Sequence, residues 1–507
     1  MKNNAYWGLL VTILVAGLAR GAVESPWVTT DRTVDCSSYE TIIHDVCGSC
    51  TNDEEKAIAL YNFYRQRVYH YLNTPESRDP VKCVNVIGNT LCGSQGTCMK
   101  GFLAAAGIKA RVVSGPGHTF YEAFYDGKGH GFDTFMNFYV FTRGTNRNVA
   151  SFDEIKKDPT LVTKAVEEGR AVTGFLPCGD TPECFMAGVS ENNYDPMKLN
   201  WSVKALSLRP GEEIVRSWWP EGKCLPGTAG KKDKTPYHGC GSQDKKAEPY
   251  LFKFWEPYGI VKYERKSVSY RHYFNGRLNY APDLTGDKYK EGMVSEKGVK
   301  ASADGLAGEG EVVFGVKCPF YISGADMLFE AVTPSADDKV ELSVSTDGKQ
   351  WKTVDVIKDA TSGVSTGSLD SVVVKGPVGL HAYQVRFALK GKAVLKHFYL
   401  STVFTHNAMA APHLMPGKNQ VKVTVAKEET LKASPLTVAY RYREAPAEAT
   451  KLLDSTAWTG DIKTVSKQVD KSPFTFEVAL PDTAKLPQMQ DLTFRCGELA
   501  WRPVVGK

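Results

Sequence analysis

The stretch from Cys92 to Asp133 predicts a helix followed at once by a hairpin, which is the strongest local constraint in the chain. Apolar residues recur at helical spacing after residue 98, and Gly107 is a typical helix stop. The stripe consists of Met99, Phe102, Leu103 and Ala106. Counting back seven residues from Met99 puts Cys92 on the same inward stripe, in the first turn of the predicted helix.

A cysteine in the first turn of a helix is a candidate nucleophile. The unpaired N–H groups and the positive end of the helix dipole both favour the thiolate over the thiol. Two alternatives stay open: Cys92 forms half of a disulfide, or Cys98 is the nucleophile. We prefer Cys92, because Cys98 lies deeper in the helix, where the influence of the dipole has faded.

The hairpin brings a histidine and an aspartate together. A β-branched strand over 108–113 is followed by a second strand, His118 to Tyr125, and by the turn signal Asp126-Gly127. A two-residue turn pairs Tyr125 with residue 128 and His118 with residue 135. Asp133 is then one diagonal step from His118, roughly 7–8 Å away at the backbone. The sequence therefore predicts a nucleophile, a base and a residue that orients the base.

These residues resemble the transglutaminase-like superfamily over about a quarter of the chain. The matching positions are Cys92-Gly93-Ser94-Gln95, 107–113 (Gly-Ile-Lys-Ala-Arg-Val-Val), His118, Glu122, Asp126-Gly127 and Asp133. The resemblance implies a papain-like α+β fold with a catalytic triad of Cys92, His118 and Asp133. Glu122 and His130 are interpreted as structural, Glu122 as a solvated strand residue and His130 as part of the turn region.

Residues 1–21 have the pattern of a cleaved secretory signal peptide, with Lys2 before the apolar run from Leu9 to Leu18 and a small-residue site at Ala19-Arg20-Gly21. The alternative, a membrane anchor, is disfavoured because the run is short. We therefore predict a secreted, periplasmic or cell-surface protein with no membrane span.

The chain has 12 cysteines, which in an exported protein favour disulfides. Close pairs such as Cys178 with Cys184 and Cys224 with Cys240 are the simplest partners. The Cys47-Gly48-Ser49-Cys50 pattern is half of a zinc motif, but no second half follows, so disulfide use is preferred.

The 507 residues exceed one core, and the pattern changes along the chain. We predict a multidomain protein: an α+β papain-like domain, then all-β sandwiches of immunoglobulin-like or galactose-binding-like type. The predicted ranges are a signal peptide (1–21), a transglutaminase-like domain with loop extensions (22–260), a connecting region (261–310), a β-sandwich (311–407) and an immunoglobulin-like domain (416–507). Ser345 to Trp351 resembles a turn of carbohydrate-associated sandwiches, and Trp218-Trp219 is assigned to the core rather than to a ligand groove.

Two functions are compared. The preferred one is an exported cysteine enzyme that acts on amide bonds of extracellular protein, peptide or glycopeptide, with hydrolysis favoured over acyl transfer. The alternative is an inactive transglutaminase-like scaffold whose sandwiches bind carbohydrate or protein. No cofactor and no metal site is predicted. A net charge of only +5 gives no reason to expect a nucleic-acid partner.

Overall fold

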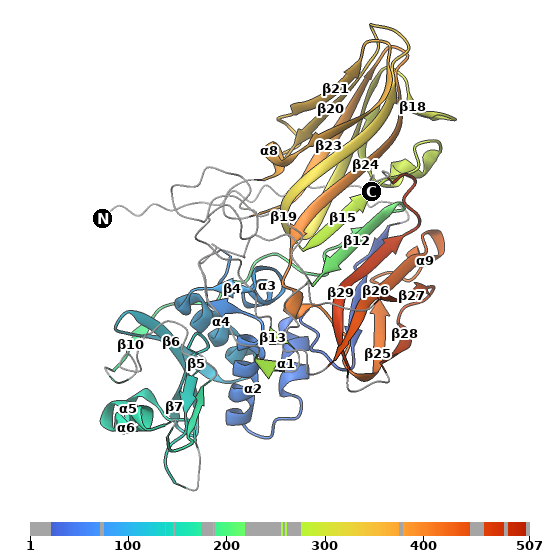
Figure 1. Ribbon diagram of the computed structural model, residues 1–507. Coiled ribbons are helices and arrows are strands. Elements are labelled where there is room, and N and C mark those ends of the chain that lie inside the picture. The colour runs from blue at the N-terminus through green and yellow to red at the C-terminus, as the bar shows by residue number, and fades with distance from the viewer. Residues whose placement is uncertain are drawn as a thin grey trace, which may run out of the picture.

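The protein is divided into a helix-rich part and a larger all-β part (Figure 1). The computed structural model describes residues 22–502 except 71–75, 137, 145–147, 166, 174–185, 187, 219–254, 257–258, 261–274, 375–378, 447–460 and 481–484. The predicted signal peptide and Trp219 lie outside these residues. Trp218 is buried in the main core, as predicted for it.

The helix-rich part packs helices against a small antiparallel sheet. Its helices are α1 (Tyr39–Cys47), α2 (Asp53–Arg65), α3 (Pro80–Lys82), the π-helical turn η1 (Cys83–Ile87), α4 (Cys92–Ala105), α5 (Phe152–Lys157) and α6 (Thr160–Thr163). Asn52 caps α2 by accepting from the Glu55 N–H, and asparagine is a preferred residue at this position. Helix α1 is not anticipated from the sequence.

The small sheet has the strand order β10-β5-β6-β7. Its strands are β5 (Lys109–Gly115), β6 (His118–Tyr125), β7 (Lys128–Phe132) and β10 (Ser190–Asn192). The Asp126-Gly127 turn pairs Tyr125 with Lys128, which confirms the predicted hairpin register. Two short pairs accompany the sheet: β3 (Tyr69–His70) with β4 (Asn89–Thr90), and β8 (Phe138–Val140) with β9 (Ala171–Thr173).

The all-β part is built on one sheet with the main order β21-β20-β23-β19-β24-β15-β12-β29-β26-β27. These strands are β12 (Glu212–Ser217), β15 (Gly276–Tyr280), β19 (Gly310–Val332), β20 (Lys339–Ser345), β21 (Lys352–Lys358), β23 (Leu380–Lys390), β24 (Val394–Thr405), β26 (Leu436–Pro446), β27 (Lys463–Val469) and β29 (Lys485–Cys496). Smaller strands flank it: β16 (Met293–Lys297), β17 (Lys300–Ser302), β18 (Gly305–Ala307) and β22 (Ser362–Ser368).

Strand β19 is 23 residues long and changes partners midway. Its first half pairs with β16 and β23, and its second half pairs with β22 and β24. The register shifts between Lys317 and Ile322, where Pro319 interrupts the run of backbone donors. One strand thus contributes to both layers of the sandwich that β19 forms with β16, β22, β23 and β24, at the top of Figure 1 and called the upper sandwich below.

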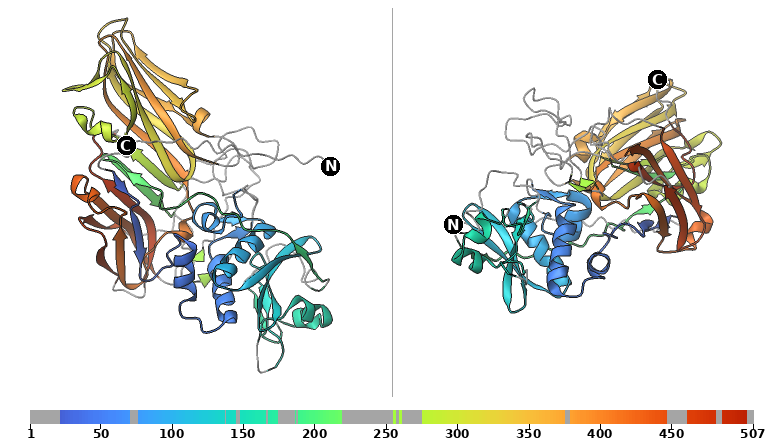
Figure 2. Two further views of the ribbon diagram at one scale, coloured as in Figure 1. Left: turned by 180° about the vertical axis from the view of Figure 1, so that it is seen from behind. Right: turned by 60° about the horizontal axis from the view of Figure 1, so that its bottom comes forward.

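The second sandwich is completed by a strand from the beginning of the described residues. Its other sheet has the order β2-β25-β28, in which β2 (Trp27–Thr30) pairs with β25 (Gly417–Thr424) and β25 pairs with β28 (Phe474–Leu480). Figure 2 shows this blue strand among the red strands of the C-terminal part. The short β1 (Val23–Glu24) pairs with β11 (Ser207–Leu208).

The predicted domain ranges stay a prediction, but the sheet crosses them. Strand β12, which falls inside the range 22–260, pairs with β15 and β29. Strand β15 falls in the predicted connecting region. The remaining described elements are β13 (Trp255–Glu256), β14 (Gly259–Ile260), η2 (Asp287–Glu291), α8 (Asp370–Val373), η3 (Ala408–Ala410) and α9 (Thr430–Ala433). The apolar residues of 369–375 are typical of a strand, but Asp370 to Val373 form α8 instead.

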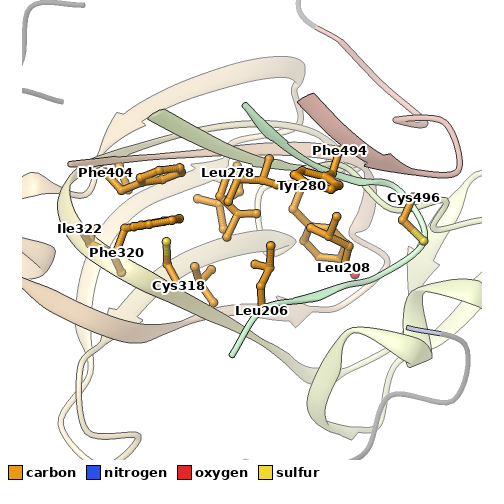
Figure 3. Close-up of a cluster of buried hydrophobic side chains, with 14 of the residues drawn as sticks. Leu206, Leu208, Leu278, Tyr280, Cys318, Phe320, Ile322, Phe404, Phe494 and Cys496 are labelled. Carbon is orange, nitrogen blue, oxygen red and sulfur yellow. The ribbon is translucent and has the colours of Figure 1, made fainter. Parts of the chain in front are cut away.

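The main core lies where the strands of the two sandwiches meet. Figure 3 shows apolar side chains from β11, β15, β19, β24 and β29 facing one another. Phe320 and Phe404 stack with their ring centroids 5.0 Å apart, and Leu278 and Tyr280 continue the layer. A continuous core of this kind joins the two sandwiches into one packed unit.

A buried polar cluster joins the helix-rich part to the upper sandwich. The Lys82 ammonium of α3 pairs with Glu76 at 2.6 Å and donates to His381 Nε2 of β23 at 2.9 Å. Tyr321 of β19 donates to the same Glu76 oxygen. His381 in turn donates from Nδ1 to the Cys318 carbonyl at 3.0 Å. The position of the loop before α4 therefore depends on the all-β part.

The turn from Ser345 to Trp351 is held by its own hydrogen bonds. Asp347 accepts from the Lys349 and Gln350 N–H groups, each at 2.8 Å, and Ser345 Oγ accepts from the Gly348 N–H at 2.9 Å. The Arg386 guanidinium lies 4.5 Å from the Trp351 ring centroid. These contacts give the motif a structural role, as an Asx-type turn.

We expect Ser38→Ala to destabilise the helix-rich part by about 1 kcal/mol. Ser38 caps α1, because its Oγ accepts from the Thr41 N–H at 3.2 Å while Thr41 Oγ1 accepts from the Ser38 N–H at 3.1 Å. Chemical denaturation followed by circular dichroism measures the loss. Ser38→Asp keeps a capping acceptor and should retain most of the stability; equal losses in both variants would argue against the cap.

Candidate active site

Cys92 is the first residue of α4, as the apolar stripe predicts. Leu91 stands at the N-cap, and its side chain has no group that can accept from the first-turn N–H groups. The positive end of the helix dipole therefore acts on the Cys92 sulfur, and it favours the thiolate. The side chain is partly exposed and packs against the core that contains Phe120 and Phe135.

His118 is the first residue of β6 and is buried. Its Nε2 lies 2.5 Å from Asp133 Oδ2, and its ring is held between Phe120 and Phe135 at centroid distances of 5.6 and 5.0 Å. A side-chain hydrogen bond with Cys92 also acts on the imidazole. The imidazole is thus bonded to both of its predicted partners.

The pKa of His118 is raised to about 10. Burial by itself lowers this pKa, but the charge of Asp133 and its hydrogen bond outweigh burial, and the hydrogen bond and charge of Cys92 add to the rise. An imidazolium held between a carboxylate and a sulfur stabilises the thiolate of Cys92.

Asp133 follows β7 and is fixed by backbone donors. Its Oδ1 accepts from the Phe135 N–H at 2.7 Å and from the Met136 N–H at 3.0 Å, and the side chain is 1% exposed. The β6–β7 ladder ends at Phe132, so the expected pair of His118 with Phe135 does not form. The chain turns away after Phe132, and this turn directs the carboxylate toward His118.

Gln95 is a positioning residue to which sequence reasoning gave no role. Its Oε1 accepts from Thr134 Oγ1 at 2.9 Å and its Nε2 donates to the Thr90 carbonyl at 3.3 Å. It therefore ties α4 to the turn that holds Asp133. The signal was present, since Gln95 lies four residues before Met99 and so falls on the inward stripe, where a polar side chain needs partners.

Close packing sets the height of α4 above the sheet. A Cβ at Gly96 would lie 3.2 Å from the Phe120 carbonyl oxygen and 3.3 Å from Val112 Cγ1. Glycine at this position lets the helix approach β5 and β6 closely. The approach brings Cys92 within reach of His118 at the start of β6.

Residues 40–144 match the family described as the transglutaminase-like superfamily, and this range includes Cys92, His118 and Asp133. Residues 40–144 form a transglutaminase-like domain. None of the curated proteins matches this chain.

Three solved structures align with parts of the chain at low similarity. A xylan-binding module has 15% identity and a TM-score of 0.20, over 24% of this chain and 95% of the module. The glycoside hydrolase domain of Endo-D from Streptococcus pneumoniae R6 has 10% identity and a TM-score of 0.13, over 45% of this chain and 34% of that chain. A β-glucuronidase from Bacteroides uniformis has 8% identity and a TM-score of 0.11, over 55% of this chain and 28% of the glucuronidase. The chain thus covers less than two thirds of the latter two.

The other two polar residues considered on the hairpin of the transglutaminase-like domain are structural. Glu122 is buried and pairs with Arg111 at 2.6 Å, so its expected solvation is wrong. His130 lies within β7 rather than in the turn, and its ring stacks on Tyr125 at 3.6 Å. Its nitrogens bond to the Val149 and Tyr125 carbonyls. Burial lowers the pKa of His130.

No disulfide joins the eight cysteines among the described residues, which differs from the expected disulfide use. Cys98 is fully buried and donates to the Ser77 carbonyl at 3.3 Å, and burial raises its pKa. Burial also raises the pKa of Cys318 to about 12. These thiols pack as small apolar groups. The pairs Cys178–Cys184 and Cys224–Cys240 lie outside the described residues.

Two further searches concern the described residues alone. They include no group of three or more His, Cys, Asp or Glu side chains placed to hold a metal ion, and this holds for the surroundings of Cys47 and Cys50. The described helices include none with the length and apolar character needed to cross a membrane.

Proposed function

We propose that the chain is an exported cysteine enzyme that attacks amide bonds of extracellular protein, peptide or glycopeptide through an acyl-enzyme, with hydrolysis favoured over acyl transfer. The observation that carries the proposal is His118, which bonds to Asp133 on one side and to Cys92 on the other. Membership of residues 40–144 in the transglutaminase-like superfamily supports the same chemistry.

The Cys92 thiolate attacks the carbonyl carbon of the amide. The backbone N–H groups of the first turn of α4 stabilise the oxyanion that forms. The His118 imidazolium then gives its proton to the leaving amine, and a thioester to Cys92 remains. Neutral His118 next takes a proton from water, which attacks the thioester and releases the acid. Asp133 holds the ring in position throughout and stabilises its charged form.

The first test is labelling of the native protein with iodoacetamide at pH 7 and peptide mapping by mass spectrometry. Cys92 should be labelled at least about tenfold faster than an ordinary thiol, while the buried thiols of Cys98 and Cys318 should not be labelled. Incubation with a casein digest and a tagged primary amine then separates the two outcomes. New carboxylates indicate hydrolysis, and incorporated tag indicates transfer. An unreactive Cys92 would favour the scaffold alternative.

We expect the labelling rate of Cys92 to be nearly constant between pH 6.5 and 8.5. His118 keeps its proton over this range because its pKa is about 10, so the thiolate stays paired. An ordinary thiol of pKa about 8.5 labels about 50-fold faster at the upper pH than at the lower. Peptide mapping after timed labelling gives both rates, with urea-unfolded protein as the reference. A similar rise for native Cys92 would contradict the ion pair.

Protein stability should fall as the pH rises from about 6.5 to 10. The pKa of His118 is higher in the folded protein, about 10, than in the unfolded chain. The folded state therefore binds more protons in this range, and the contribution of His118 is full below pH 6.5 and lost as the pH passes 10. Denaturation of the native protein and of His118→Gln at several pH values measures the difference. Parallel curves would show that His118 contributes nothing.

A further inference from the structure

Tyr194 lies directly beside the first turn of α4. A Cβ built on Gly93, the residue after Cys92, would lie 3.1 Å from Tyr194 Cε2. The tyrosine side chain is nevertheless 41% exposed, which is unusual for so large an apolar group. One part of its ring therefore covers the helix start, and the rest is open to solvent next to the candidate nucleophile.

The backbone on both sides of Tyr194 is anchored. Before it, β10 pairs with β5, with Asn192 opposite Val112, and Asn192 donates to Ser114 Oγ. After it, Asp195 pairs with Lys100 of α4 at 2.7 Å. The Lys100 ammonium also donates to the Tyr194 carbonyl at 3.4 Å. The position of the ring is thus set by α4 and β5, the elements that also position Cys92.

We propose that Tyr194 is a substrate-binding residue that receives the apolar side chain of the peptide residue whose carbonyl Cys92 attacks. The proposal rests on the proposed function, since it needs an acyl group on Cys92. We place the oxygen of the attacked carbonyl at the N–H groups of the first turn of α4. The side chain of the same peptide residue then lies next to Gly93. The exposed ring of Tyr194 is the apolar surface at that place, and aromatic pairs gain energy beyond simple burial.

The exposed ring of Tyr194 is an apolar surface, and an aromatic peptide side chain gains energy by packing on it. Tyr194 also lies outside residues 40–144, the part that matches the superfamily. The selectivity it confers thus comes from a residue outside the matched range.

Two matched affinity labels test the proposal on the full chain. Acetyl-phenylalanine chloromethyl ketone and acetyl-alanine chloromethyl ketone each alkylate the Cys92 sulfur, which displaces chloride, and they differ only in the side chain in question. We expect the phenylalanine label to react with the native protein about tenfold faster than the alanine label. This ratio should fall to about two or less in Tyr194→Ala and be retained in Tyr194→Phe.

The outcomes separate this proposal from the proposed function. If iodoacetamide shows that native Cys92 is no more reactive than an ordinary thiol, the proposed function fails and the inference fails with it. If Cys92 is reactive but the native ratio is near one, or Tyr194→Ala keeps it, only the inference is overturned. Protection of Cys92 by oligosaccharides with a ratio near one would assign the ring to a glycan instead. A native ratio near one overturns the inference even if a variant fails to fold, and Tyr194→Phe is the variant that changes the fold least.

Discussion

Replacing His118 by alanine is expected to slow acyl-enzyme formation by about a thousandfold or more. The imidazole supplies two things that no neighbouring side chain replaces, namely the charge that keeps Cys92 as a thiolate and the proton for the leaving amine. The variant also leaves Asp133 buried without the partner that lies 2.5 Å away in the native protein. Rapid-quench mass spectrometry of Cys92 with an activated ester or amide measures the rate.

Two further variants sharpen the result. His44→Ala removes a histidine whose side chain is 86% exposed on α1, and it should react at the native rate. Asp133→Asn keeps the shape of the side chain but removes the charge that raises the pKa of His118. We expect an intermediate loss and a labelling rate that rises with pH. A His118→Ala protein that is folded and reacts at the native rate would contradict the proposed catalytic triad.

Replacing Lys82 by alanine is expected to destabilise the protein by about 3–5 kcal/mol. The Lys82 side chain is 2% exposed, and its ammonium neutralises Glu76 inside the contact between the two parts of the molecule. Burial and the charge of Lys82 lower the pKa of His381 to about 4, so this ring is neutral and accepts from the ammonium. Without Lys82, the half-buried Glu76 carboxylate keeps the hydrogen bond from Tyr321 but has no counter-charge. Chemical denaturation measures the loss.

The double variant Lys82→Met with Glu76→Gln is the matched control. It removes both charges together and keeps much of the volume, so it should lose far less stability than Lys82→Ala. The difference between the two variants isolates the cost of the uncompensated charge. If Lys82→Ala changes the unfolding free energy by less than about 0.5 kcal/mol, as for an exposed pair, the cluster is not a buried ion pair in solution.

The geometry around Cys92 was predictable because its determinants are local. The position of Cys92 follows from a stripe within one helix, and the meeting of His118 with Asp133 follows from one two-residue turn. Even here, the ladder ends one residue before Asp133, and backbone donors rather than strand pairing aim its carboxylate. The position of Tyr194 could not be predicted, because Tyr194 and Gly93 are about a hundred residues apart in the sequence and no periodic pattern relates them.

The sequence predicts the fold class of the all-β part, sandwiches of short strands, but it does not predict which strands pair with one another. Two apolar runs separated by Pro319 have the pattern of two separate strands, but they form the single strand β19 because different partners satisfy each half. Strands β22 and β27 carry few large apolar residues and gave no signal. Conversely, the run 369–375 looks like a strand, but Asp370 accepts from the Ala325 N–H and α8 forms.

The pairing of β2 with β25 has a consequence for how the protein is made. Asp31, at the end of β2, accepts from the Gln420 N–H, 389 residues later in the chain. During synthesis the transglutaminase-like domain emerges long before β25, the partner of β2. The edge of β2 therefore stays unpaired during this time. Closing so distant a contact is slow. A chain shortened before residue 417 therefore has no strand to pair with the edge of β2. We expect it to aggregate rather than to yield an isolated domain.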